Sequence, residues 1–256
     1  MGRARWVTWG EWNAVRIVGI IQARMGSSRL PGKVLRELEG RSVLGWVVRA
    51  AREAGALDDL LVATTTEPAD DAVVAECRRL DVAWHRGPVD DVLTRFVQAL
   101  EGRRWEAMMR FTADCPLLDP AVIREAALVY RAVPGLDYLS TSLARTLPRG
   151  LDVEIAGRAA LLRADAEATG FHRTHVTSHI YAHPGDARLL GLAHQPAADD
   201  LRVTLDTEDD WRLITAVAAA FGDRCVPART LVSWLRERPE VCGLNAHVRQ
   251  KALQEA

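Results

Sequence analysis

Lysine is scarce in this chain of 256 residues, where Lys33 and Lys251 are the only two lysines among 33 Lys and Arg residues. The basic residues are scattered and the formal net charge is −1, so nothing marks a nucleic-acid-binding surface. Long apolar runs are absent too, since no stretch approaches the roughly 20 apolar residues that a membrane span needs. We therefore expect neither a nucleic acid nor a membrane as a partner.

Cysteine is also sparse, and no two cysteines form a CxxC pair. The four are Cys77, Cys115, Cys225 and Cys242. Their wide spacing argues against a disulfide scaffold and against a thiolate zinc site, and it favours a reduced, cytoplasmic protein. The start of the chain lacks the continuous apolar segment of a signal peptide, which agrees with that location.

The chain shows no repeat, low-complexity tract or clear linker, and its length suffices for one large α/β domain. We expect an N-terminal extension at residues 1–15, with Trp6, Trp9 and Trp12. A single domain at residues 16–240 and a C-terminal tail at residues 241–256 follow. Within the domain, residues about 140–200 are expected to form a small inserted lobe for the acceptor substrate and for dimer contacts.

From Arg16 to about Tyr138, short apolar runs alternate with amphipathic stretches. The expected strands are Ile17–Gln22, Leu60–Thr64, Val82–His85, Met108–Thr112 and Asp137–Ser140. The expected helices are Val43–Ala54 after a Ser42 cap, Ala69–Leu80, Val89–Leu100 and Pro120–Arg131 after an Asp119 cap. This alternation predicts a mostly parallel sheet with helices on both faces.

The second half of the chain has a less regular pattern. A loop within Leu147–Ile155 turns into a short strand, and a polar, His-rich stretch occupies His172–Ala182. The expected further strands are Ala187–Ala193 and Arg202–Leu205, and the expected further helices are Arg158–Ala168, Glu208–Phe221 and Thr230–Glu237.

The most informative stretch is IIQARMGSSRLPGKVL, which spans Ile20–Leu35. A buried strand ends here in a loop rich in Gly, Ser and basic residues, which suits a polyphosphate held by backbone N–H groups. Lys33 adds a compact ammonium charge, which phosphate loops often use. The spacing fits neither a Walker P-loop nor GxGxxG, because Gly26 and Gly32 are six residues apart and Lys33 precedes Val34. By composition alone, an ordinary surface turn is the alternative.

Further motifs follow in a fixed order along the chain. They are ATT at Ala63–Thr65 with Asp70 and Asp71, RGPVDDVL at Arg86–Leu93, RFTADCPL at Arg110–Leu117, Tyr138 with LPRGLDVE at Leu147–Glu154, HRTHVT at His172–Thr177, and VTLDTED at Val203–Asp209. With the opening stretch, these motifs resemble the cytidylyltransferase family that contains spore-coat polysaccharide biosynthesis protein F. That family is related to the synthetases of CMP-activated sialic acid and Kdo, and the resemblance spans roughly residues 17–215.

The resemblance implies a Rossmann-like, GT-A-type nucleotidyltransferase fold. It also implies an enzyme that transfers CMP from CTP to an acidic sugar or related acid, with Mg²⁺ as cofactor and pyrophosphate as the second product. A place in nucleotide-sugar and polysaccharide biosynthesis and a homodimeric assembly follow from the same resemblance.

Nucleotidyl transfer depends mainly on positioning and on neutralising phosphate charge. We expect Arg24, Lys33 and Asp114 to be catalytic. The expected nucleotide contacts are Ala23, Arg24, Gly26, Ser27, Ser28, Arg29, Lys33, Thr64, Asp90 and Asp91. Asp90 and Asp91 precede a helix, and for one of them a favourable interaction with the helix dipole is the alternative.

Mg²⁺ in such enzymes is held by one or two carboxylates and by phosphate oxygens. Asp114, just past a buried strand, is the first candidate ligand, and Asp206 is the second. Each has a structural alternative, since Asp114 can be a turn residue and Asp206 can cap the helix that follows. The two are 92 residues apart in sequence, so only the fold can bring them together.

The acceptor side is the least defined by sequence. The resemblance implies acceptor contacts for Arg149, Asp152, Glu154 and His175, of which Arg149 suits a carboxylate or phosphate. A solvated strand face is the alternative for the first three, and dimer packing is the alternative for His175. A zinc site made of His172, His175, His179 and His183 is disfavoured because neither HExxH nor a thiolate partner is present. The family usually has Glu where this chain has Thr174 and Pro where it has Ser178, which leaves the acceptor open.

Three alternatives remain at this point. One is a nucleotidyltransferase that uses another NTP or a sugar phosphate. Another is a GT-A-type glycosyltransferase that uses a nucleotide sugar, although the TADCP segment lacks the second Asp of a DxD motif. The third is a non-catalytic nucleotide-binding relative, which would be expected to lack Lys33 or Asp114.

Overall fold

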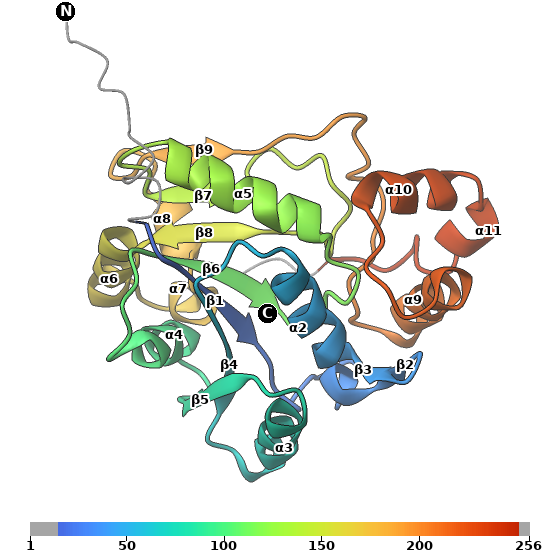
Figure 1. Ribbon diagram of the computed structural model, residues 1–256, viewed down its shortest axis with the longest axis horizontal. Coiled ribbons are helices and arrows are strands. Elements are labelled where there is room, and N and C mark those ends of the chain that lie inside the picture. The colour runs from blue at the N-terminus through green and yellow to red at the C-terminus, as the bar shows by residue number, and fades with distance from the viewer. Residues whose placement is uncertain (1–14, 251–256) are drawn as a thin grey trace, which may run out of the picture.

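The computed structural model describes residues 15–250 and shows a seven-stranded sheet flanked by helices (Figure 1). The strand order is β5-β4-β1-β6-β8-β7-β9. Strands β5, β4, β1 and β6 run parallel, β8 is antiparallel to both of its neighbours, and β9 pairs parallel with β7. The expected α/β fold with a mostly parallel central sheet is confirmed.

The elements have the following bounds. The strands are β1 (Ile17–Gln22), β2 (Glu37–Leu38), β3 (Arg41–Ser42), β4 (Asp59–Thr65), β5 (Ala83–Gly87), β6 (Ala107–Thr112), β7 (Tyr138–Ser140), β8 (Glu154–Gly157) and β9 (Leu189–Gly191). The helices are α2 (Val43–Glu53), α3 (Asp71–Arg79), α4 (Val92–Leu100), α5 (Pro120–Ala132), α6 (Arg158–Glu167), α7 (Phe171–Thr174), α8 (Ser178–Ala182), α9 (Glu208–Phe221), α10 (Ala228–Arg236) and α11 (Pro239–Cys242). Two 3₁₀ helices lie at Lys33–Leu35 and Pro68–Asp70.

Strand β1 is buried on both faces because it lies inside the sheet. Ile17 and Ile21 belong to the apolar cluster that includes α2 and α5, whereas Val18 and Ile20 belong to the cluster that includes α4 and α6. A continuous apolar run is what an interior parallel strand needs. Figure 1 shows α2 and α5 crossing one face of the sheet, with α9, α10 and α11 grouped at one side of the molecule.

Helix caps explain where the main helices begin. The Ser42 side chain accepts a hydrogen bond from Gly45 N at 2.9 Å at the start of α2. The Asp119 side chain accepts one from Ala121 N at 2.8 Å at the start of α5. Both caps satisfy backbone N–H groups that the helix itself leaves unpaired, and both were expected from the sequence.

The strand expected at Arg202–Leu205 is wrong. This segment makes a single parallel bridge, with Arg149, and no ladder. Its backbone divides its hydrogen bonds between two loops, because Val203 N donates to Arg149 O at 2.7 Å and Leu205 N donates to Asp114 O at 2.8 Å. The segment is an extended connector, and the apolar alternation of its side chains does not distinguish a connector from a strand.

Several short elements were not expected. They are the β2–β3 hairpin and the helices α7 and α8, which occupy the His-rich stretch. The division into an extension, one domain with an inserted lobe, and a tail stays a prediction. Residues 1–14 and 251–256, and with them the three tryptophans of the extension, lie outside the described residues. Between residues 15 and 250, no helix is long and apolar enough to cross a membrane.

The sheet places two loops side by side. Gln22, the last residue of β1, lies opposite Thr112, the last residue of β6. The opening loop therefore leaves the sheet at Ala23 and the TADCP loop leaves it at Ala113, at the same edge. Ligands of open α/β sheets bind at this carboxyl edge of the strands.

Candidate active site

A cavity of about 470 Å³ lies at the carboxyl ends of β1 and β6. The opening loop, the loop after β6, the segment before β8 and the turn after α7 contribute to its wall. Most of the predicted site residues line it. They are Arg24, Gly26, Ser27, Ser28, Arg29, Lys33, Asp114, Arg149, Asp152, Glu154, His175 and Asp206.

Lys33 joins the two carboxylates that were predicted as metal ligands. Its Nζ donates to Asp114 Oδ2 at 2.7 Å, to Asp206 Oδ1 at 2.8 Å and to Leu205 O at 2.7 Å. Burial opposes the charged form of Lys33, but the two carboxylates outweigh burial and raise its pKa. The fold thus directs Asp114 and Asp206, 92 residues apart in sequence, at a single cation.

Asp206 is surrounded by positive charge. Its Oδ2 lies 3.0 Å from the Arg29 guanidinium and accepts a hydrogen bond from Arg202 at 2.7 Å. Burial alone would raise the pKa of Asp206, yet Lys33 and the two arginines hold it below its usual value. The carboxylate is therefore charged at neutral pH and suited to bind a cation.

The buried carboxylate of Asp70 holds the opening loop in place through hydrogen bonds. Asp70 accepts hydrogen bonds from Met25 N at 2.7 Å and from Thr65 N at 3.1 Å, and it is 2% exposed. Gly32 has a φ of +69°, a conformation that favours glycine, and its N–H closes the loop on Met25 O at 3.0 Å. Asp70 and Gly32 together fix the path of the loop at both ends.

The loop leaves donors free for a ligand. Among residues 15–250, the backbone N–H groups of Gly26, Ser28 and Arg29 donate to no protein acceptor. Gly26 and Ser28 are exposed, and all three residues line the cavity. Neighbouring free N–H groups beside basic side chains form an anion-binding concavity.

Four predicted nucleotide contacts lie outside the cavity lining. Ala23 is buried and its N–H donates to Ala63 O, and Thr64 is fully buried. Asp90 is exposed. Asp91 caps α4 through Thr94 N and pairs with the guanidinium of Arg173 in α7. Asp91 thus has the structural role that the sequence left open, and the nucleotide-binding roles of all four stay predictions.

Glu154, which also lines the cavity, lies at the centre of a largely buried polar cluster. It accepts hydrogen bonds from Arg110 NH1 at 2.7 Å, from the Tyr138 hydroxyl at 2.7 Å and from the Thr177 hydroxyl at 3.2 Å. Burial raises the pKa of Glu154, but Arg110 and the hydroxyl donors outweigh burial and lower it. The side chain is therefore a fixed, charged acceptor of hydrogen bonds.

Two more arginines that line the cavity lie in the segment before β8. Arg145 NH1 donates to Asp152 Oδ1 at 2.6 Å, which pairs their charges. Arg149 is paired with no carboxylate within the described part of the chain. Burial, and then the nearby charge of Arg145, lowers the pKa of Arg149. Arg149 thus offers an unpaired charge to a ligand.

The His-rich stretch packs rings against one another. The His172 ring lies 5.6 Å from the His179 ring and 6.2 Å from the His183 ring, and His172 Nδ1 is 2.8 Å from the Ser178 hydroxyl. Burial, followed by the neighbouring imidazoles, lowers the pKa of His172. Within residues 15–250, no group of three or more His, Cys, Asp or Glu side chains is arranged to hold a metal ion. Of the four histidines, His175 lines the cavity.

Sequence reasoning missed several residues that build the site. Arg110 and Tyr138 belonged to the recognised motifs. The signal that could have identified them was Glu154, a carboxylate on the strand that pairs with both of their strands. Asp70 also stood in a motif, but its role depends on a loop 45 residues away. Arg145 and Arg202 had no local signal, because their partners are known only from the fold.

Comparisons with known proteins agree with this geometry. The sequence model of the cytidylyltransferase family matches residues 18–214. The spore coat polysaccharide biosynthesis protein SpsF of Bacillus subtilis is 32% identical over 234 residues, covering 88% of this chain and 95% of that protein. A solved cytidylyltransferase from Leptospira borgpetersenii has a TM-score of 0.86 at 22% identity, over 93% of this chain and 99% of that one. A CMP:2-keto-3-deoxy-manno-octonic acid synthetase complexed with CTP has a TM-score of 0.59 at 17% identity, over 80% and 99%.

A Rossmann-like sheet, with a Gly- and Ser-rich loop and two converging carboxylates at its carboxyl edge, defines the chain as a nucleotidyltransferase. The family match covers most of the chain, and the chain belongs to the cytidylyltransferase family. The resemblance drawn from the sequence motifs is thereby confirmed.

Proposed function

We propose that this protein is a metal-dependent cytidylyltransferase that transfers CMP from CTP to an acidic sugar or related acid and releases pyrophosphate. The observation that carries the proposal is the convergence of Asp114 and Asp206 on one cationic group, Lys33 Nζ, beside the free N–H groups of the opening loop. The loop and the two carboxylates supply the anion-binding and cation-binding halves that a nucleoside triphosphate and its metal require.

The two carboxylates fit a hard divalent cation. Asp114 Oδ2 and Asp206 Oδ1 both accept from the same ammonium at 2.7 and 2.8 Å, so the two oxygens already face one positive charge. Mg²⁺ prefers such oxygen donors and fills its remaining positions with water and phosphate oxygens. When bound, it would neutralise charge on the transferring phosphate.

The opening loop is assigned to the triphosphate. Backbone N–H groups of Gly26, Ser28 and Arg29 are free to donate to phosphate oxygens. The side chains of Arg24 and Lys33 neutralise the negative charge that accumulates as pyrophosphate leaves. Asp70 keeps the loop in place while these donors remain aimed at the cavity.

The charges of β6 and of the segment before β8 favour an acceptor with a single negative charge. Of the three arginines that these described segments contribute to the cavity lining, Arg110 is neutralised by Glu154 and Arg145 by Asp152, which leaves Arg149 to bind a ligand anion. One guanidinium matches one carboxylate in bidentate geometry. A sugar phosphate, with nearly two negative charges, fits this arrangement less well.

Several names support the choice of substrates. The family is described as cytidylyltransferase, the Bacillus subtilis relative is named for spore coat polysaccharide biosynthesis, and the related synthetase was solved with CTP. We therefore place the reaction in nucleotide-sugar and polysaccharide biosynthesis in the cytoplasm. We also propose a homodimer, which sedimentation of the purified protein tests.

Pyrophosphate release tests the proposal directly. The protein is incubated with Mg²⁺ and each of CTP, UTP, ATP and GTP, against panels of sugar acids and of sugar phosphates. We expect turnover with CTP and a sugar acid, and none when the metal is chelated. Turnover with sugar phosphates alone, or transfer from a nucleotide sugar without pyrophosphate formation, would contradict the proposed acceptor or the proposed reaction.

A further inference from the structure

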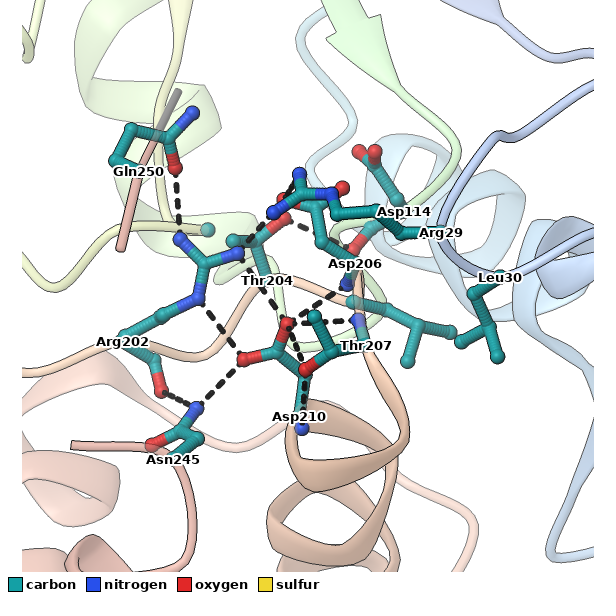
Figure 2. Close-up of polar contacts among 12 residues, drawn as sticks. Arg29, Leu30, Asp114, Arg202, Thr204, Asp206, Thr207, Asp210, Asn245 and Gln250 are labelled. Atoms are coloured by element: carbon teal, nitrogen blue, oxygen red, sulfur yellow. Dashed lines mark hydrogen bonds and ion pairs between the residues drawn. The ribbon is translucent and has the colours of Figure 1, made fainter. Parts of the chain in front are cut away.

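Asp206 is held by a buried network at the start of α9 (Figure 2). Asp210 is fully buried, and its Oδ2 accepts hydrogen bonds from the backbone N–H groups of Asp206 and Thr207 at 2.9 and 3.0 Å. Thr207 and Asp210 also form a capping box. The backbone that carries Asp206 is therefore fixed independently of its side chain.

Arg202 lies between the carboxylates of this network. Its Nε donates to Asp210 Oδ1 at 2.9 Å, and its Nη2 donates to Asp206 Oδ2 at 2.7 Å and to Asp210 Oδ2 at 3.2 Å. Its third nitrogen, NH1, donates to Gln250 Oε1 at 2.7 Å. The side chain is 8% exposed. All three nitrogens of the guanidinium thus have partners, and Figure 2 shows them spread around the group.

The two oxygens of Asp206 are used differently. Oδ2 takes Arg202, and also Arg29, whose side chain is 28% exposed and reaches in from the opening loop. Oδ1 takes Lys33 and so faces Asp114. Because Arg202 is the buried partner, it is the permanent anchor of Oδ2. That anchor leaves Oδ1 as the oxygen presented to the cation position.

The C-terminal segment supports the same network. Asn245 is 2% exposed, and its Nδ2 donates to Asp210 Oδ1 at 2.8 Å and to Arg202 O at 3.1 Å. This residue lies beyond residues 18–214, which the family model matches. The last described part of the chain therefore helps to hold Asp206 through Arg202 and Asp210.

We propose that Arg202 is the positioning residue of the cation site: it binds Asp206 Oδ2 and so directs Oδ1 toward Asp114. Asp210 holds the guanidinium, and Asn245 supports Asp210 and the backbone of Arg202. The inference rests on the proposed function, because it assigns Asp206 to a divalent cation. It concerns how the Asp206 carboxylate is oriented, which the proposed function does not specify.

The geometry separates this role from a purely structural one. An ion pair that only held the start of α9 would be complete with Arg202 on Asp210, which also accepts four hydrogen bonds from other residues. The Nη2 group of the guanidinium also donates to Asp206 at the cavity wall, and this bond of 2.7 Å is shorter than its 3.2 Å bond to Asp210. A planar guanidinium can hold two carboxylates in a fixed relation, whereas an ammonium is a single point charge.

Replacement Arg202→Lys tests the proposal, since lysine keeps the charge and loses the fork. The wild type and the variant are titrated with Mn²⁺ alone and with Mn²⁺ plus CTP, without acceptor, while free Mn²⁺ is followed by electron paramagnetic resonance. We expect Mn²⁺ affinity to fall about 10-fold or more, the scale for losing a group that orients a metal ligand. Arg212→Lys, in an exposed pair with Asp209 on the same helix, is the matched control and should bind Mn²⁺ as the wild type does.

The melting temperature without metal, recorded on the same samples, separates the two roles. A lower melting temperature with unchanged Mn²⁺ affinity would show a structural role and overturn the inference. If Arg202→Lys does not fold, Asn245→Ala decides in its place, because it removes support for Asp210 without changing charge. Weaker Mn²⁺ binding by that variant supports the inference and unchanged binding overturns it. A wild type that neither binds Mn²⁺ nor turns over any NTP would instead refute the proposed function.

Discussion

Lys33 and Asp114 form an ion pair of 2.7 Å in the wall of the cavity, and the same ammonium is shared with Asp206. The pair joins the opening loop to the loop after β6. In this arrangement, the lysine expected to contact phosphate instead holds the two carboxylates expected to contact metal. Under the proposed function, nucleotide binding would change the partners of Lys33, and this exchange leads to the first prediction.

Replacing Lys33 should separate catalysis from cation binding. Lys33→Met removes a charge that stabilises the leaving phosphates, so kcat/KM should fall by about 10²-fold or more. It also removes the ammonium that occupies the carboxylates, so Mn²⁺ should bind the nucleotide-free variant more tightly than the wild type. Steady-state kinetics and Mn²⁺ titration measure the two effects. Wild-type values for both would show that Lys33 lies outside the working site.

Asp114→Asn is the companion to that variant. It keeps the size of the side chain but removes a charged oxygen that faces the cation position. We expect kcat/KM to fall by about 10²-fold or more, with circular dichroism unchanged. Mn²⁺ affinity should fall rather than rise, which is the opposite of the result expected for Lys33→Met. Equal Mn²⁺ affinity in both variants would contradict the assignment of the carboxylates.

Arg149→Ala should act on the acceptor alone. Its guanidinium is paired with no carboxylate among residues 15–250 and lines the cavity beside the Arg145–Asp152 pair. Loss of one bidentate charge contact should raise the acceptor KM by about 10-fold or more, with little change in the KM for CTP. Arg163→Ala, remote from the cavity lining, is the control. An increase in the KM for CTP alone would assign Arg149 to nucleotide binding and contradict its role in binding the acceptor.

Asp70→Ala should weaken the opening loop. It leaves the N–H groups of Met25 and Thr65 without their buried acceptor, which costs about 1–3 kcal/mol. We expect lower stability in urea and a higher KM for CTP. Asp71→Ala provides the control, because that side chain is exposed and should change stability by less than about 0.5 kcal/mol. Equal effects of the two substitutions would refute the role of Asp70.

Glu154→Gln should destabilise the protein in a way that depends on pH. The substitution leaves Arg110 buried without its counter-charge, which costs about 3–5 kcal/mol at neutral pH. Because the pKa of Glu154 lies below its ordinary value of 4.5, its charge stabilises the fold above pH 4.5 and this contribution is lost as the pH falls below it. Urea unfolding at pH 7 and near pH 3.5 should show the difference between wild type and variant shrinking in acid. A constant difference would contradict the ion-pair account.

The regular strands and helices of the fold were predictable because local sequence patterns indicate them. Strand β1 matched its predicted bounds, and α9 did so as well, since a continuous apolar run and a capping residue before Glu208 are both visible in the sequence. The cap of α9 is Thr207, however, and not Asp206. The connector at residues 202–205 was not predictable. Its alternation resembles a strand, whereas its hydrogen bonds go to Arg149 and Asp114 through the fold.

The site shows the same division. Lys33 was a candidate because lysine is rare in this chain, and Asp114 was a candidate because it follows a buried strand. That Asp114 would meet Asp206 was implied by the family resemblance and not by spacing, and that Lys33 would hold both carboxylates was not predicted. Arg202 was not identified from the sequence because its role depends on its contacts with Asp206 and Asp210. It also depends on Asn245, which lies in a segment beyond the motifs.

The sequence by itself determined the sheet, the opening loop and the chemical kind of the groups at its edge. Those features depend on residue type and local spacing, and short-range physics fixes them. Only the tertiary structure decided that Lys33 holds both carboxylates, that Glu154 is buried against Arg110, and that Arg149 is left unpaired. Charge pairing depends on distance in space, and distances between segments 40 to 170 residues apart are set by how the whole sheet packs.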